Sequence, residues 1–210
     1  MGQVLLVRHG QASWGADDYD VLSETGRRQA AAVGRALAEV KPDLVVHGAM
    51  RRQRDTARIA AEAAGWSAEL REDARWDEMD HQALMDQVEP GFGGTPDRQQ
   101  FQAWFERATE RWTGGAHDGD YLESWPDFRT RVLAALADLA EVGTVVVVTS
   151  GGPVSAVVTD LLGAGVTTYA RLSPVVVNSS VTRVVAGRRG LTLVSFNGHE
   201  HLDRELLTYR

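Results

Sequence analysis

The sequence predicts an α/β protein, a three-layer sandwich in which helices flank both faces of a central, mostly parallel β-sheet. Two observations lead to this prediction. Continuous apolar and β-branched runs occupy residues 4–7 and 144–149, which is typical of strands buried on both faces of a parallel sheet. Segments of helical periodicity alternate with these runs, and that alternation indicates parallel strands joined by right-handed crossovers.

In the first half of the chain, a helix is expected over residues 22–40, where Ser23 can cap the N-terminus and apolar residues recur at helical spacing. A third, shorter strand is expected over residues 42–48. The next helix covers residues 51–65 and ends on Gly65, a residue suited to the C-terminus of a helix. These elements continue the alternation that begins with the first strand.

In the second half of the chain, proline and glycine mark the limits of the elements. Residues 125–143 have proline near the first turn and glycine at the end, and residues 153–163 also begin with proline, so both segments predict helices. Residues 177–198 alternate around a Gly-Arg-Arg-Gly turn, which predicts a β-hairpin. We expect residues 79–124, rich in glycine and aromatic residues, to form a loop-and-helix insertion over the strand ends of a single domain spanning residues 1–210.

Composition excludes several classes of protein. The chain has 210 residues, a net charge of −7 and no cysteine. The acidic balance argues against nucleic acid as a partner, because such proteins normally present a basic face. The lack of cysteine excludes a disulfide framework and a thiol nucleophile. No apolar run approaches the roughly 20 residues that span a membrane, and the N-terminus lacks the features of a signal peptide. We therefore expect a cytoplasmic protein without a membrane partner.

Polar residues follow three of the predicted strands, at the sheet edge where open α/β proteins bind their ligands. The three groups are Arg8, His9 and Gly10; His47 and Gly48 with the following Arg51, Arg52 and Arg54; and Thr149, Ser150, Gly151 and Gly152. Guanidinium groups and the N–H groups at the start of a helix both bind phosphate well. A histidine among arginines also favours nucleophilic attack on phosphorus, since the cations stabilise the transferring group. The residues predict a site for a phosphorylated ligand.

Six segments form a pattern that extends over nearly the whole chain: "LLVRHGQ", "LSETGRRQA", "RRQRDTA", "GDYLESWPDFRTRV", "VVVVTSGG" and "NGHEHL". Arg-His-Gly alone would be a weak signal. Arg-His-Gly at the end of the first strand, followed by Leu-Ser-x-x-Gly-x-x-Gln-Ala, is a specific one. On these motifs the chain resembles the histidine phosphatase superfamily, branch 1, the phosphoglycerate-mutase-like group, which implies that group's α/β sandwich.

The resemblance implies a role for several residues. His9 would be the nucleophile that forms a transient phosphohistidine. Arg8 and Arg52 would hold the phosphoryl oxygens, together with Ser150 and Gly151 at the end of the strand over residues 144–149. Glu78 would protonate the leaving oxygen. Neighbouring residues leave alternatives open: Arg51 and Arg54 could take the place of Arg52, and the acids Asp77 and Asp80 could take the place of Glu78. The resemblance implies neither a metal ion nor an organic cofactor.

Ser150 departs from the family pattern, which has a second histidine at this position. Serine offers one hydroxyl donor and no positive charge, so its presence could lower the rate by about 10²–10³-fold. His47 stands where the family commonly has serine, and a compensating role for His47 is one hypothesis. Gln11 and Gly15 replace a glutamate and an asparagine that are typical of the mutases, so we do not expect mutase activity.

Three functions remain open from the sequence. The first is a phosphomonoester hydrolase that acts through phosphohistidine on a small phosphorylated substrate. The second is a pseudo-phosphatase that binds phosphorylated ligands after its chemistry has weakened. The third is a serine hydrolase with Ser150 as nucleophile, which Gly152 favours and which the lack of glycine at Val148 disfavours. The sequence does not identify the substrate, and an exposed sheet edge could pair two chains in a homodimer.

Overall fold

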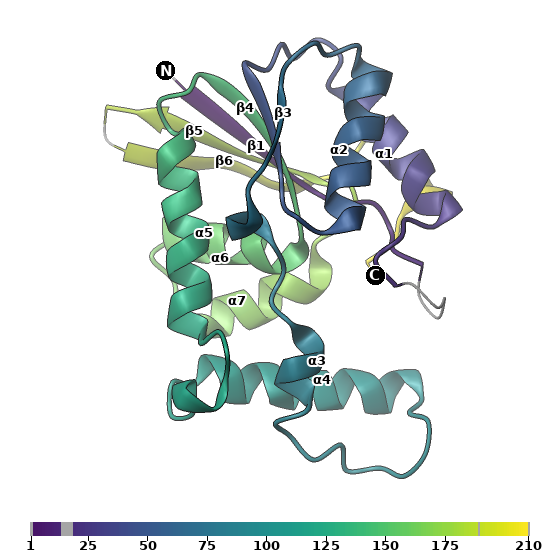
Figure 1. Ribbon diagram of the computed structural model, residues 1–210, viewed down its shortest axis with the longest axis vertical. Coiled ribbons are helices and arrows are strands. Elements are labelled where there is room, and N and C mark those ends of the chain that lie inside the picture. Colours follow the sequence, from purple (N-terminus) through teal and green to yellow (C-terminus); the bar gives the residue numbers. More distant parts are fainter. Residues whose placement is uncertain (1, 14–18, 189, 210) are drawn as a thin grey trace.

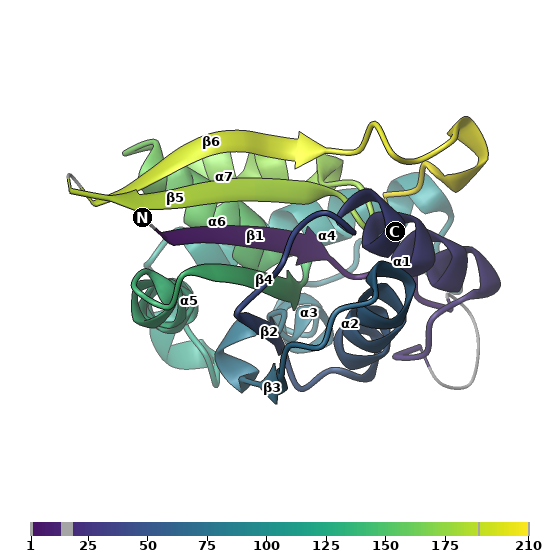
Figure 2. The same cartoon turned by 90° about the horizontal axis from the view of Figure 1, so that it is seen from above.

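The computed structural model describes residues 2–13, 19–188 and 190–209. Within them, six strands form one sheet in the order β3-β2-β4-β1-β5-β6, which can be followed across Figure 2. β1 to β4 are parallel to one another, and β5 is antiparallel to both of its neighbours, β1 and β6. The strands are β1 (Gly2–Arg8), β2 (Leu44–His47), β3 (Leu70–Glu72), β4 (Thr144–Thr149), β5 (Val181–Gly187) and β6 (Gly190–Gly198). The mostly parallel sheet of the α/β prediction is confirmed.

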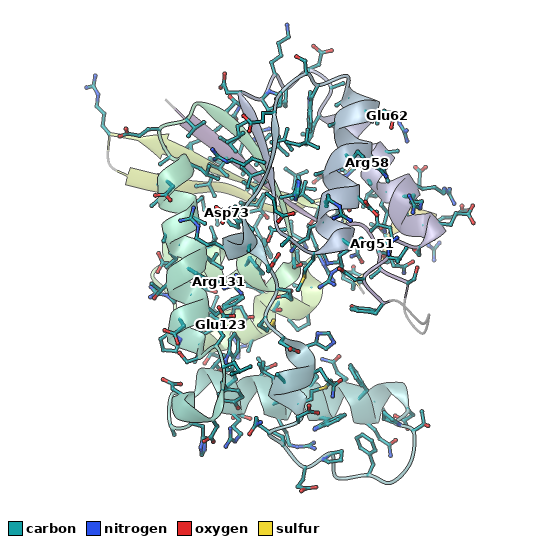
Figure 3. The ribbon with its side chains drawn as sticks, in the orientation of Figure 1. Arg51, Arg58, Glu62, Asp73, Glu123 and Arg131 are labelled. Atoms are coloured by element: carbon teal, nitrogen blue, oxygen red, sulfur yellow. The ribbon has the colours of Figure 1, made fainter. Side chains whose placement is uncertain are left out.

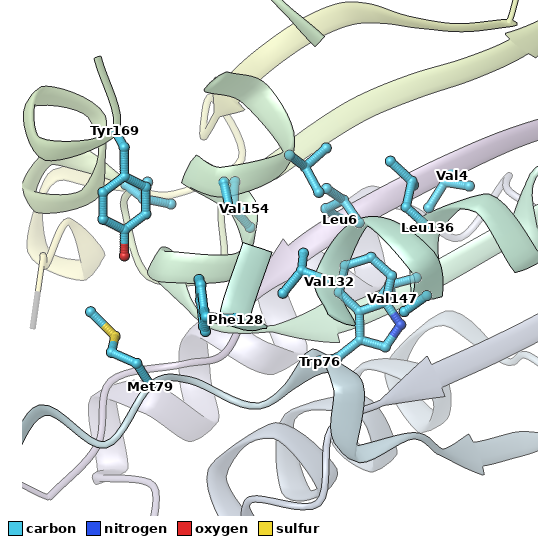
Figure 4. Packing of buried hydrophobic residues seen from close by; sticks show 14 of the residues in the cluster. Val4, Leu6, Trp76, Met79, Phe128, Val132, Leu136, Val147, Val154 and Tyr169 are labelled. Atoms are coloured by element: carbon cyan, nitrogen blue, oxygen red, sulfur yellow. The ribbon is translucent and has the colours of Figure 1, made fainter. Parts of the chain in front are cut away.

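Helices cover both faces of this sheet (Figure 1). α1 and α2 pack on the face that carries Leu5 and Val7 of β1. α5 and α6 pack on the opposite face, which carries Val4 and Leu6, and Figure 4 shows part of this core. The helices are α1 (Glu24–Ala36), α2 (Arg51–Ala64), α3 (His81–Met85), α4 (Arg98–Thr113), α5 (Trp125–Leu139), α6 (Gly151–Leu161) and α7 (Val166–Leu172). Short 3-10 helices are η1 (Ala74–Trp76), η2 (Asp118–Asp120), η3 (Ser173–Val175) and η4 (Arg204–Leu206).

The register of the central strands aligns their carboxyl ends. Arg8 at the end of β1 lies opposite Thr149 at the end of β4, and His47 at the end of β2 lies opposite Val148. Each strand is buried up to that edge, so its side chains have little freedom. The polar residues that follow the strands therefore emerge at one level of a rigid sheet.

Some elements differ from the sequence prediction. β3 was not predicted, because its Leu-Arg-Glu sequence is exposed and lacks the apolar run of a buried strand. α7 was not predicted either, and it has no side-chain cap at its N-terminus. α6 begins at Gly151, two residues before the expected Pro153, because proline is tolerated inside the first turn of a helix. No helix in the described part of the chain is long and apolar enough to cross a membrane.

α3 and α4 lie beyond the end of the sheet in Figure 1, within the segment expected to cover the strand ends. α4 begins with a capping box, in which the Asp97 side chain accepts from the Gln100 backbone and the Gln100 side chain accepts from the Asp97 backbone. Trp112 anchors the far end of α4, where it packs edge-on against Trp125 and Phe128 of α5. The helix is thus fixed to the rest of the molecule near its C-terminus.

Candidate active site

A cavity of about 620 Å³ opens at the carboxyl ends of the central strands. Its walls bring together five of the six residues that the sequence singles out as site residues: Arg8, His9, Arg52, Glu78 and Gly151. These residues come from four separate parts of the chain, and the parallel sheet is what places them side by side. Ser150, the sixth, is fully buried and is not among the described residues that line the cavity.

His9 presents one ring nitrogen as a hydrogen-bond acceptor. Its Nδ1 lies 2.7 Å from the carbonyl oxygen of Gly10, and its Nε2 lies 3.1 Å from Nε of Arg52. Because a carbonyl only accepts and a guanidinium only donates, the imidazole is neutral, with the proton on Nδ1. Burial, then the charges of Arg52 and Arg8, hold the pKa of His9 well below its usual 6.5. The Nε2 lone pair is therefore present at neutral pH.

The backbone just after His9 is held by contacts with α1 and α2. Gly10 donates its N–H to Oγ1 of Thr56 at 3.0 Å. A Cβ at Gly10 would lie 2.3 Å from the carbonyl oxygen of Gly26, so the two backbones touch at a distance that only glycine allows. Ser23 caps α1 by accepting from the N–H of Gly26, and its hydroxyl donates to Gln11. The Leu-Ser-x-x-Gly motif thus fixes the loop that carries His9.

Arg52 is the arginine of its cluster that enters the cavity. Its side chain is 7% exposed, whereas Arg51 and Arg54 are exposed residues at the start of α2. The guanidinium donates from Nε to His9, and its Nη1 donates to Oδ1 of Asp20 at 2.7 Å. The ring of Tyr19 lies 5.4 Å from the guanidinium carbon, a distance typical of a cation–π contact. Arg52 is therefore oriented from three sides.

Arg8 is anchored by the C-terminal part of the chain. Its Nη1 donates to the carbonyl oxygen of Tyr209 at 3.0 Å and to that of Val176. Burial lowers the pKa of Arg8 to about 10, against the opposing effect of the Glu78 charge. A Cβ at Gly151 would lie 3.7 Å from Nε of Arg8, so the start of α6 rests against this guanidinium. Arg8 remains positively charged at neutral pH.

Glu78 lies at the N-terminus of α6. Its Oε2 accepts from the N–H of Gly152 at 3.0 Å, and a Cβ at Gly152 would lie 2.0 Å from Oε1. The neighbouring acids have other partners. Asp77 accepts from the N–H of Ala49 at 2.7 Å, and Asp80 caps α3. Of the three acids considered from the sequence, Glu78 alone is among the described residues that line the cavity.

The segment before Glu78 is fastened by Arg131 of α5. One nitrogen of Arg131, Nη1, donates to the carbonyl oxygens of Arg75 and Asp77, each at 2.8 Å. Another, Nη2, donates to Glu123 at 2.9 Å. Figure 3 shows Arg131 and Glu123 beside α5. Arg131 is thus a positioning residue that holds the backbone on which Glu78 stands.

Ser150 has a glutamine as its partner. Nε2 of Gln53 donates to Oγ of Ser150 at 2.8 Å and to the carbonyl oxygen of Trp76 at 3.1 Å. Gln53 is fully buried between the ends of β2 and β4. His47 points its Nδ1 at the carbonyl oxygen of Gly48 at 2.8 Å, and it is not among the described residues that line the cavity. Gly15 lies outside the described residues.

Several cavity residues were not found from the sequence. His81 lines the cavity beside Glu78, and its ring meets the ring of Tyr19 edge-on at 5.9 Å. Burial lowers the pKa of His81 from 6.5. The signal available was weak, a histidine three residues after the proposed acid. Tyr209 was missed because nothing local indicates that the C-terminal segment returns to the first strand. In the described part of the chain, no group of three or more His, Asp and Glu side chains is arranged to hold a metal ion.

Solved structures share this fold. The Bacillus stearothermophilus protein YhfR is 20% identical, with a TM-score of 0.71 over 96% of this chain and 99% of its own. A mycobacterial glucosyl-3-phosphoglycerate phosphatase in complex with VO3 is 24% identical, with a TM-score of 0.68 over 95% of this chain and 100% of its own. A phosphoserine phosphatase mutant from Entamoeba histolytica, in complex with phosphoserine, is 20% identical, with a TM-score of 0.68 over 96% of this chain and 100% of its own.

Among curated proteins, no significant match was found. The family profile described as "Histidine phosphatase superfamily (branch 1)" matches residues 4–199, which include all of the proposed site residues. This match covers far more than half of the sequence, and the similarity of fold agrees with it. The chain belongs to branch 1 of the histidine phosphatase superfamily.

Proposed function

We propose that this protein is a phosphomonoester hydrolase that acts through a phosphohistidine on His9. One observation carries the proposal. The Gly10 carbonyl holds the proton of the His9 ring on Nδ1, so Nε2 keeps its lone pair; this lone pair accepts from Arg52 and becomes the nucleophile when the guanidinium binds a phosphoryl oxygen instead. A neutral imidazole in a cationic setting suits attack on an anionic phosphoryl group.

In the proposed first step, the phosphoryl oxygens bind to Arg8 and Arg52. Nε2 of His9 attacks phosphorus while the bond to the ester oxygen breaks. Glu78, protonated in this step, gives its proton to the leaving oxygen, so the alcohol departs neutral. Two observations support this role: Glu78 accepts from the start of α6, and it lines the same cavity as His9, Arg8 and Arg52. A proton donor at the leaving oxygen is needed because an alkoxide is a poor leaving group.

In the second step, water attacks the phosphohistidine. The carboxylate of Glu78 takes one proton from the water, the N–P bond breaks, and its electron pair returns to Nε2 of His9. Inorganic phosphate leaves, and Glu78 is protonated for the next turnover. The cycle needs water and the substrate only. Because Gln11 and Gly15 replace residues that are typical of the mutases, we propose hydrolysis and not mutase activity.

We also propose that the turn at Ser150 and Gly151 supports the site mainly through its backbone. Gln53 engages the Ser150 hydroxyl, and Gly151 lies against Arg8. Without the second histidine, one charged donor to the phosphoryl group is lost. The alternative function, a pseudo-phosphatase that binds phosphate without turning it over, rests on this loss.

A single-turnover experiment with 4-nitrophenyl phosphate tests the proposal. Wild type should release nitrophenolate and carry an acid-labile phosphoryl adduct, seen by intact mass after an alkaline quench. His9→Ala should show neither. His47→Ser is the matched control, since His47 also ends a strand and donates to the next glycine, yet lies outside the cavity lining. Nitrophenolate release that persists in His9→Ala would contradict the mechanism, and folded wild type with neither signal would support the pseudo-phosphatase.

A further inference from the structure

A second cavity, of about 550 Å³, adjoins the one that holds His9. The two cavities share five wall residues: Met79, Gln102, Phe105, Ser173 and Pro174. The second cavity continues from these shared walls between α4 and α7, and Figure 1 shows the two helices in this arrangement. Shared walls make the two cavities neighbouring parts of one groove.

The groove is long because it follows α4. Wall residues on this side run from Gln99 in the first cavity to Gly114, just beyond the helix, in the second. A helical rise of 1.5 Å per residue gives this wall a length of about 22 Å. A phosphorylated amino acid or a sugar monophosphate is much shorter, and would fill only the end of the groove nearest His9.

The middle and far parts of the groove are mainly apolar. Met79, Phe105 and Pro174 line the part that the cavities share. Thr109 and Thr113 line the far part, but each donates its hydroxyl proton to a backbone carbonyl one turn earlier in α4, at 2.9 Å. Their hydroxyl protons are thus engaged within α4 and are not available to a ligand.

Exposed apolar side chains also line this groove. Val175 and Tyr209 in the first cavity are 46% and 51% exposed, and Val166 in the second is 38% exposed. A ligand in the groove would cover them. The charged residues of the far part, Glu106, Glu110 and Arg171, are exposed as well, which fits a rim where a polar ligand end meets water.

We propose that this groove binds the phosphomonoester of an extended, mainly apolar alcohol, with its phosphate at His9 and its chain between α4 and α7. The inference rests on the proposed hydrolase function and names its class of substrate. The two arginines at one end select the phosphate, and the apolar walls select the chain. The ligand binds as a single dissolved molecule and not from a membrane surface, because a groove between two helices can enclose one alkyl chain.

The test compares kcat/KM for butyl, octyl and dodecyl phosphate below their micelle concentrations, with inorganic phosphate release as the readout. The dodecyl ester should exceed the butyl ester by at least about tenfold, because each buried methylene group adds a several-fold gain in binding. Ala170→Trp places a bulky ring in the far part of the groove, where Ala170 is exposed on α7, and should bring the dodecyl-to-butyl ratio close to one. Thr167→Trp is a second variant with the same expected effect.

Ala103→Trp is the matched control, since Ala103 is exposed on α4 and is not among the described residues that line either cavity. It should keep the wild-type ratio. Equal kcat/KM along the series, or a preference that survives both groove variants, would overturn the inference and leave the hydrolase function standing. Hydrolysis of dodecyl phosphate only in phosphatidylcholine vesicles, or faster hydrolysis of a phosphoserine peptide, would overturn it too. No hydrolysis of any ester by folded protein would instead refute the hydrolase function itself.

Discussion

His9 and His47 have the same local setting and differ in their tertiary partners. Each lies at the end of a buried strand, and each has Nδ1 within 2.8 Å of the carbonyl oxygen of the next glycine. Only His9 has Arg52 at its other nitrogen and a place in the cavity wall. The short sequence His-Gly therefore could not separate the two histidines. What separated them was the wider motif, since Thr56 and Gly26 hold the loop after His9.

The lowered pKa of His9 predicts an unusual pH profile. Because burial and the charges of Arg52 and Arg8 keep the imidazole neutral, kcat/KM for 4-nitrophenyl phosphate, an ester whose own phosphate ionises below pH 6.5, should stay level as the pH falls through 6.5. Arg52→Gln removes a nearby positive charge, so the pKa of His9 should rise. The fall of kcat/KM on the acidic side of the profile, its acidic limb, should then occur at higher pH. Arg54→Gln removes an exposed arginine of the same helix and should leave the limb in place. A limb near pH 6.5 in wild type would contradict this assignment.

Ser150 and Gln53 are both fully buried and joined by a hydrogen bond at the end of β4. Ser150→His alone should lower stability by about 1–3 kcal/mol, because Gln53 is fully buried 2.8 Å from the Ser150 hydroxyl and leaves no room for a ring. The double variant Ser150→His with Gln53→Ala should regain most of that stability and raise kcat by about tenfold or more. Urea unfolding and 4-nitrophenyl phosphate turnover measure the two effects. A single variant as stable as wild type would refute the packing argument.

At the scale of elements, the site depends on how helices fasten the segments between strands. The loop that leads from β3 to Glu78 has little regular structure apart from η1. Arg131 of α5 compensates by donating to two of its carbonyl oxygens, and Asp77 ties the same loop to the start of α2. These contacts join parts of the chain more than 25 residues apart. The sequence alone therefore did not distinguish Glu78 from Asp77 and Asp80.

The Arg131 contacts predict an effect on turnover with little effect on binding. Arg131→Lys keeps the positive charge but loses the planar guanidinium group, which donates to two carbonyl oxygens and to Glu123 at the same time. We expect kcat to fall about ten- to a hundredfold, with KM nearly unchanged, because Glu78 shifts while Arg8 and Arg52 stay in place. Arg129→Lys, on the same helix but paired with Asp160, should leave both constants unchanged. Equal changes in kcat and KM would refute the positioning role.

At the scale of the whole molecule, the fold was predictable because two strong signals agree. Continuous apolar runs identify β1 and β4, and capping residues identify most of the helices between them. The strand-end rule then located Arg8, His9 and Gly151 in one region. The groove between α4 and α7 was not predictable, because it is formed by two helices more than 50 residues apart and one of them was not expected.

The first strand ends in contacts with the last part of the chain. Asn178 donates to the carbonyl oxygen of His9, Thr208 donates to Asn178, and the Tyr209 carbonyl accepts from Arg8. During synthesis, His9 therefore leaves the ribosome long before the groups that hold it. A growing chain can therefore form most of the sheet before the contacts that hold Arg8 and His9 are complete.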